Sequence, residues 1–103
     1  MRIDKYLQVS GLIKRRVLAN EACKRGLVKV NGKTAKATRD IEIGDIIEIS
    51  LARREICIKV LQEIRGNSLK KSLRPEFYEI LKDEAITPDP DLDDFWENNI
   101  DED

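Results

Sequence analysis

The stretch that decides the fold is VKVNGKTA, residues 28–35. Short strand-like segments lie on either side of its central pair, Asn31-Gly32. A two-residue type I′ turn requires a positive φ at both central positions, and Asn followed by Gly adopts that conformation readily. The stretch therefore predicts a tight β-hairpin in which Asn31 and Gly32 have a structural, supporting role.

Two further strands are predicted after the hairpin, because apolar residues recur there at every second position. A turn at Ile43-Gly44-Asp45 leads into the first strand, and a charged turn at Arg53-Arg54-Glu55 separates it from the second. Period-two alternation places one set of side chains on the buried face of a sheet. The residues expected on that face are Ile47, Ile49, Leu51, Ile56, Ile58 and Val60.

Two short helices are predicted before the hairpin. Ile3, Tyr6 and Leu7 follow the i, i+3, i+4 spacing of a helix face, and this helix should end at Ser10-Gly11. A second helix is expected over about residues 16–25, with Gly26 at the left-handed position that follows a helix end. The side chains that this helix should bury are Val17, Leu18 and Ala22.

The C-terminal third has a different pattern. Helical spacing and a proline suited to a first turn predict another short helix, and the acid-rich segment from Asp83 is predicted to be disordered. The residues that carry the helical spacing are Leu73, Phe77, Ile80 and Leu81.

The fold class that these elements predict is α+β, with two N-terminal helices packed on a short, mostly antiparallel sheet. We expect this domain to cover residues 1–66. A linker with the short C-terminal helix should follow over residues 67–84, and the acidic tail over residues 85–103.

The composition argues against an enzyme and against a cofactor or metal site. The 103 residues include no histidine, which removes the commonest general base and metal ligand. Cys23 and Cys57 lie 34 positions apart, so they form no metal-binding pair and are expected to be packing residues of a reduced, cytoplasmic protein. No segment has the pattern of a signal peptide or a membrane span.

The charges are strongly segregated along the chain. Residues 1–39 hold 11 basic and two acidic side chains, a net charge of +9, and residues 83–103 hold ten acidic side chains and no basic ones. The overall charge of −1 therefore hides an N-terminal third that suits a polyanion such as RNA.

Three consecutive cations, Lys14-Arg15-Arg16, stand where the second helix begins. Cations are locally unfavourable at a helix N-terminus, whose free N–H groups attract anions, so this placement indicates a phosphate site. A solvated run of charge is the competing interpretation. On the same helix Arg16, Asn20 and Lys24 form one polar row, which would follow a nucleic-acid backbone or face water.

Other residues are secondary candidates for RNA contacts. Arg2 and Lys5 add charge at the first helix, and Asp4 among them is expected to orient an arginine rather than to perform catalysis. The candidate phosphate contacts around the hairpin are Lys29, Lys33 and Lys36.

Four motifs, in order and over about residues 1–60, resemble the S-four RNA-binding domain. They are Arg2-Ile3-Asp4-Lys5-Tyr6-Leu7, Arg16-x-x-Ala19 followed by Gly26, Val28-x-Val30-Asn31-Gly32-Lys33, and Ile43-Gly44-Asp45-x-Ile47. The run Leu12-Ile13-Lys14-Arg15-Arg16 is similar to a branch of small ribosome-associated quality-control factors related to heat-shock protein fifteen.

This resemblance implies a non-enzymatic, monomeric factor that contacts large-subunit rRNA and peptidyl-tRNA while a quality-control elongation factor extends the stalled chain. The matching positions are Arg2, Asp4, Lys5, Lys14, Arg15 and Arg16. The acidic extension after Asp83 departs from the family pattern.

Three interpretations of the tail remain open. In the alternative to an RNA-binding factor, the tail anchors a protein partner through Leu92, Phe95, Trp96 and Ile100, and RNA binding is secondary. In the second, the tail docks on the basic face by ion pairing, with a further apolar or cation–π contact from Phe95 and Trp96, and competes with RNA. In the third, the tail is a solubilising acidic segment that does not dock.

Overall fold

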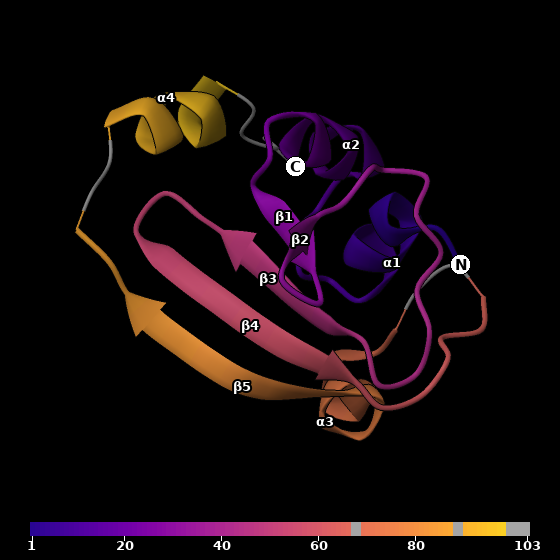
Figure 1. The fold of residues 1–103 in the computed structure, drawn as a ribbon. Helices are drawn as coiled ribbons and strands as arrows, with labels where there is room; N and C mark the ends of the chain where they lie inside the picture. Colours follow the sequence, from indigo (N-terminus) through magenta and orange to yellow (C-terminus); the bar gives the residue numbers. More distant parts are fainter. Residues whose placement is uncertain (67–68, 88–89, 99–103) are drawn as a thin grey trace.

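The computed structural model describes residues 1–66, 69–87 and 90–98. Two helices cover one face of a curved five-stranded antiparallel sheet, whose strands lie in the order β2-β1-β3-β4-β5 (Figure 1). The elements are α1 (Ile3–Val9), α2 (Arg16–Lys24), β1 (Val28–Val30), β2 (Lys33–Thr34), β3 (Ile46–Ser50), β4 (Arg54–Val60), the 3-10 helix η1 (Lys71–Leu73), α3 (Arg74–Phe77), β5 (Tyr78–Ala85) and α4 (Pro90–Asn98). The α+β fold and the two N-terminal helices on an antiparallel sheet are confirmed.

The predicted hairpin is present and joins β1 to β2. Val30 pairs with Lys33, and the two residues between them have φ values of +52° at Asn31 and +83° at Gly32. Both values lie in the left-handed region that a type I′ turn requires. The turn therefore depends on the Asn-Gly pair that predicted it.

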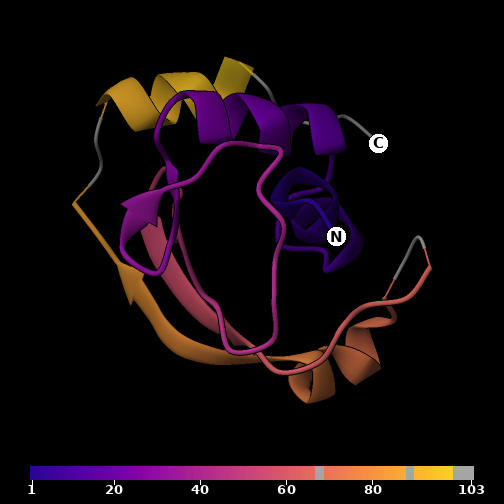
Figure 2. The ribbon, with the colours of Figure 1, turned by 45° about the vertical axis from the view of Figure 1, so that its right-hand side comes forward.

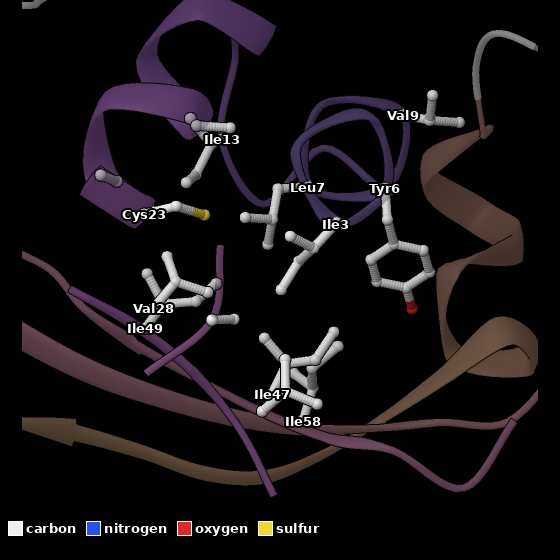
Figure 3. Close-up of a cluster of buried hydrophobic side chains, with 14 of the residues drawn as sticks. Ile3, Tyr6, Leu7, Val9, Ile13, Cys23, Val28, Ile47, Ile49 and Ile58 are labelled. Carbon is white, nitrogen blue, oxygen red and sulfur yellow. The ribbon is translucent and has the colours of Figure 1, made fainter. Parts of the chain in front are cut away.

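The core lies between the two helices and the inner face of the sheet (Figure 3). Ile3, Tyr6 and Leu7 of α1 meet Ile47 and Ile58 of the sheet, and all five side chains are buried. Burying a large apolar side chain contributes roughly 1.5–3 kcal/mol, so this layer fixes how α1 sits on the sheet.

Val17 is not buried as predicted, because 73 % of it is exposed. The buried face of α2 consists of Leu18, Ala19, Ala22 and Cys23. At 3.6 residues per turn, a residue one position before Leu18 projects almost opposite the centre of that face. The prediction selected an apolar residue on the wrong side of the helix.

The helix predicted through Leu81 is wrong in its second half. Residues 71–77 are helical as η1 and α3, but Tyr78 begins β5, which pairs with β4 from Val60 to Arg54. A β-bulge between Cys57 and Ile58 shifts the register opposite Leu81. The unpaired edge of β4 offers backbone hydrogen bonds that outweigh the local helical spacing. The division of the chain at residues 66 and 84 stays a prediction.

The acidic tail is not disordered over residues 90–98, where it forms α4. Phe95 is 7 % exposed, and the indole Nε1 of Trp96 donates a hydrogen bond of 3.2 Å to the backbone carbonyl of Ser50. Leu92, Phe95 and Trp96 have i, i+3, i+4 spacing and give the acidic segment one apolar face to bury. The predicted disorder of residues 88, 89 and 99–103, and any role of Ile100, lie outside the described residues.

Within the described residues, no helix has the length and apolar character needed to cross a membrane.

Candidate nucleic-acid interface

Asp4 joins the two N-terminal helices into one charged site. Its carboxylate is almost completely buried in the first turn of α1, where it accepts a 2.7 Å hydrogen bond from the backbone N–H of Lys5. The Arg2 guanidinium donates to it at 3.0 Å, and the side-chain amide of Asn20 on α2 donates at 3.4 Å. The Nε of Arg16 lies 3.5 Å from the same carboxylate.

The electrostatics of this cluster keep Asp4 ionised. Burial alone would raise the pKa of Asp4, but hydrogen bonds from Asn20 and Lys5 and the charges of Arg16 and Arg2 together hold that pKa below its ordinary value. The arginines keep 43 % and 44 % of their side-chain surface exposed. A buried anion therefore fixes two guanidiniums from different helices while leaving both accessible to a ligand. This geometry is what the predicted orienting role of Asp4 requires, and the role itself stays a prediction.

The N-terminus of α2 presents its three cations to solvent. Arg15 occupies the N-cap with an extended backbone, and no side chain there caps the helix. Lys14, Arg15 and Arg16 are all exposed. The first N–H groups of a helix have no partner within it, so guanidinium and N–H donors are available here for the same anion.

The polar row on α2 is brought together only in part. Arg16 and Asn20 both converge on Asp4, whereas the ammonium group of Lys24 lies 3.5 Å from Glu21 in an exposed ion pair. Lys5 is half-buried on α1, where its backbone N–H rather than its ammonium group bonds to Asp4.

The hairpin carries its lysines on the exposed side of the sheet edge. Lys29 and Lys33 lie on β1 and β2, Lys36 follows them, and all three are exposed. These side chains extend the positive surface away from the helices. The segment after Lys36 meets the first turn of α1 through its backbone, where the N–H of Asp4 donates to the carbonyl of Ala37 at 3.3 Å.

Asn31 and Gly26 support the site without facing a ligand. The Asn31 side-chain amide donates to Asp45 at 3.1 Å, and its oxygen accepts from the Ile46 N–H at 3.0 Å, which ties the hairpin to the start of β3. Gly26 has a φ of +74° immediately after α2. Sequence reasoning missed the role of Asp45, although the Gly44-Asp45 pair after the hairpin is the signal that would have found it.

The cysteine thiols are held in their neutral form. Burial and the charge of Asp4 raise the pKa of Cys23 to about 11, and burial with nearby Glu48 raises that of Cys57. Protonated thiols are poor nucleophiles and poor metal ligands. Among the described residues, no group of three His, Cys, Asp or Glu side chains is placed to hold a metal ion.

The tail helix meets the basic region at the C-terminal end of α2. The Arg25 guanidinium lies 5.3 Å from the centre of the Phe95 ring, and Phe95 and Trp96 are in edge-to-face contact with ring centres 4.9 Å apart. Figures 1 and 2 both show α4 at the same end of the molecule as α2. The predicted cation–π contact between the tail and the basic N-terminal third is present, and it is made by Arg25, which the sequence analysis did not name. The predicted competition with RNA stays a prediction.

This fold and this arrangement of cations define an S4-domain protein. The S4 domain family model matches residues 1–47, which cover both helices, the hairpin and the start of β3. Similar curated proteins are the RQC P-site tRNA stabilizing factors of Streptococcus pneumoniae and Bacillus subtilis. The first is 40 % identical over 86 residues, 84 % of this chain and 96 % of that protein. The second is 38 % identical over 86 residues, 84 % of this chain and 98 % of that protein. The chain belongs to this family.

Solved structures agree on the fold. Heat Shock Protein 15 of Vibrio cholerae superposes with a TM-score of 0.71 over 96 % of this chain and 91 % of that chain, and at 23 % identity it supports the fold alone. The hypothetical protein HP1423 has a TM-score of 0.69 and 34 % identity, and the match covers 82 % of this chain and all (100 %) of that chain.

Proposed function

We propose that this protein is a non-enzymatic, cytoplasmic RNA-binding factor. It acts in ribosome-associated quality control, where it binds large-subunit rRNA and peptidyl-tRNA on obstructed subunits. The observation that carries the proposal is the Asp4-centred pair of guanidiniums beside the open N-terminus of α2. The names of the relatives, which describe stabilisation of P-site tRNA, support it.

The geometry suits recognition of an RNA backbone. Arg2 and Arg16 are held in place before any ligand arrives, so their binding to phosphate costs little side-chain entropy. Lys14 and Arg15 add charge at the same helix end, and the hairpin lysines extend the positive surface. Cations on a convex surface read shape and phosphates rather than base edges. A factor of this kind holds a tRNA in place as a monomer while a partner elongation factor acts on the chain.

The alternative of a protein adaptor has less support. Its anchors would be the aromatic residues of the tail, but Phe95 is buried against the domain and Trp96 is bonded to Ser50. The two aromatic anchors that an adaptor would use are therefore already engaged by the domain itself.

Co-sedimentation with purified large ribosomal subunits tests the proposal. Arg16→Ala should weaken binding several-fold, and Arg15→Glu/Arg16→Glu should abolish it. Arg16→Ala should stay folded, because the buried Asp4 carboxylate keeps its hydrogen bonds from Arg2, Asn20 and the Lys5 N–H. The melting temperature of every variant is measured in parallel, so that a loss of binding is separated from a loss of fold. Lys59→Ala is the control, because Lys59 is an exposed cation on β4 outside the site. Unchanged binding by the Arg15/Arg16 double variant would overturn the proposal.

A further inference from the structure

A second group of cations lies outside the site described above. Residues 65–75 include four basic side chains and no acidic one. We call these four the second basic cluster: Arg65, Lys70, Lys71 and Arg74. Arg65, Lys70 and Lys71 are exposed, and Lys71 and Arg74 begin η1 and α3.

Arg74 connects this cluster to the region of the first site. Its guanidinium packs so closely over Gly11 that a Cβ added at Gly11 would overlap it. Gly11 has a φ of +83° in the connection between α1 and α2, three residues before Lys14. Figure 2 shows α3 below α1, on the same side of the molecule as the N-terminus. Arg74 therefore links the second basic cluster to the α1–α2 connection, which also carries Lys14.

In the part of the chain that the structure describes, none of the four cations of the second basic cluster forms an ion pair with a carboxylate. Two carboxylates lie near the cluster: Glu63 lines the same groove as Arg65 and Lys70, and Glu76 follows Arg74 on α3. The Nε of Arg74 is buried with no hydrogen-bond partner. Four cations beside two carboxylates leave a local excess of positive charge, which attracts an external anion.

Two of the three exposed members of the cluster share a surface. Arg65 and Lys70 both line a groove of about 710 Å³ whose apolar wall includes Ile64 and Phe77. Ile64 is buried in the core, which fixes the backbone next to Arg65. The longest dimension of the whole molecule is 35 Å, so one folded RNA can reach both regions.

We propose that the second basic cluster binds the sugar-phosphate backbone of the same RNA that the first site contacts. The RNA-binding surface then consists of two basic regions, the first site and the second basic cluster, with the α1–α2 connection between them. This inference rests on the proposed function and extends it to residues after the S4 domain match, which ends at residue 47.

A pair of charge-matched variants tests the inference. Lys70→Gln/Lys71→Gln removes two cations from the cluster, and Lys59→Gln/Lys82→Gln removes two from β4 and β5. Both change the net charge equally, so a difference between them reports position. Binding to protein-free large-subunit rRNA and to intact large subunits is measured over a range of salt concentrations, together with the melting temperature.

The Lys70/Lys71 variant should bind both probes several-fold more weakly than the control at low salt. Each lost phosphate contact makes the slope of log K against log salt shallower by about 0.7–0.9, so a loss of about 1.4–1.8 is expected. Equal affinities and slopes for the two variants would overturn the inference. A loss confined to intact subunits would also overturn it, because the partner would then be a ribosomal protein.

The Arg15→Glu/Arg16→Glu variant, measured in parallel, separates this inference from the proposed function. If that variant loses binding while Lys70→Gln/Lys71→Gln behaves as the control does, the second surface is refuted and the proposed function stands. If neither variant loses binding, the proposed function and the inference about the second basic cluster are both refuted.

Discussion

Replacing Asp4 by Asn tests whether this residue acts by orienting arginines. Charge alone predicts tighter RNA binding, because the substitution removes a negative charge from a surface that attracts a polyanion. The structure predicts the opposite, because the Asp4 carboxylate holds Arg2 and Arg16 in place. Asn keeps the size of the side chain and one oxygen acceptor but loses the charge that binds both guanidiniums.

The size of the effect follows from two opposing contributions. Immobilising a long side chain on binding costs about 0.5–1.5 kcal/mol, so releasing two arginines weakens binding by about 1–3 kcal/mol. Removing the negative charge of Asp4 also removes its repulsion of an RNA phosphate, which strengthens binding by about 1 kcal/mol for two charges about 4 Å apart in water. The net loss is about 1 kcal/mol, or about fivefold in affinity.

The assay is equilibrium binding to large ribosomal subunits, with Asp40→Asn as the control. The Asp40 side chain is 81 % exposed and its carboxylate lies 3.9 Å from the terminal amine. Its pairing with Arg2 is a backbone bridge, so Asp40→Asn makes the same charge change without removing a side-chain contact of either arginine. The control should bind as well as or slightly better than the unaltered protein. Asp4→Asn binding as tightly as Asp40→Asn would refute the orienting role.

Three further outcomes are expected. Gly32→Val should lower the melting temperature by about 5–10 °C, because a left-handed backbone costs a non-glycine residue about 1–2 kcal/mol. No atom lies within 4 Å of the added Cβ, so backbone strain rather than a steric clash is the expected cause. An unchanged melting temperature would contradict the strain argument. The pKa of Asp4 is depressed on folding, so its contribution to stability is present above the unfolded pKa near 3.8 and is lost as pH falls through the lower folded value. The stability difference between the unaltered protein and Asp4→Asn, measured by denaturant unfolding, should therefore shrink below about pH 4, and a pH-independent difference would contradict it. A chain ending at Thr87 keeps β5 and removes α4. It should bind arbitrary RNA several-fold more tightly than the full chain at low salt, and this gain in affinity should fade as the salt concentration rises. Equal affinities of the full and shortened chains would show that the tail does not compete with RNA.

The parts of the fold that were predictable depend on local chemistry. Asn31-Gly32 requires a left-handed turn wherever it occurs between strand-like segments, and the hairpin formed as predicted. β5 was not predictable in this way, because Tyr78 onward is extended only through pairing with β4. Likewise, α4 needs the surface offered by Ser50 and Arg25, which are distant in sequence.

In the candidate site, too, some features follow from the local sequence and others depend on contacts between distant segments. The presence of Asp4 among cations was visible in the sequence and predicted its orienting role. Its bond to Asn20, 16 residues away, depends on how α1 packs on α2. Arg74 was not singled out because its approach to Gly11 joins segments more than 60 positions apart.

The contact between Trp96 and Ser50 has a practical consequence, because the chain contains a single tryptophan. The indole lies half-buried, edge-to-face with Phe95 and next to the end of α2. Its ultraviolet emission therefore comes from one defined place and shifts to longer wavelength when water replaces the protein around it. The unlabelled protein is its own optical sensor for α4, and an RNA titration followed by this signal reads out the position of the helix directly.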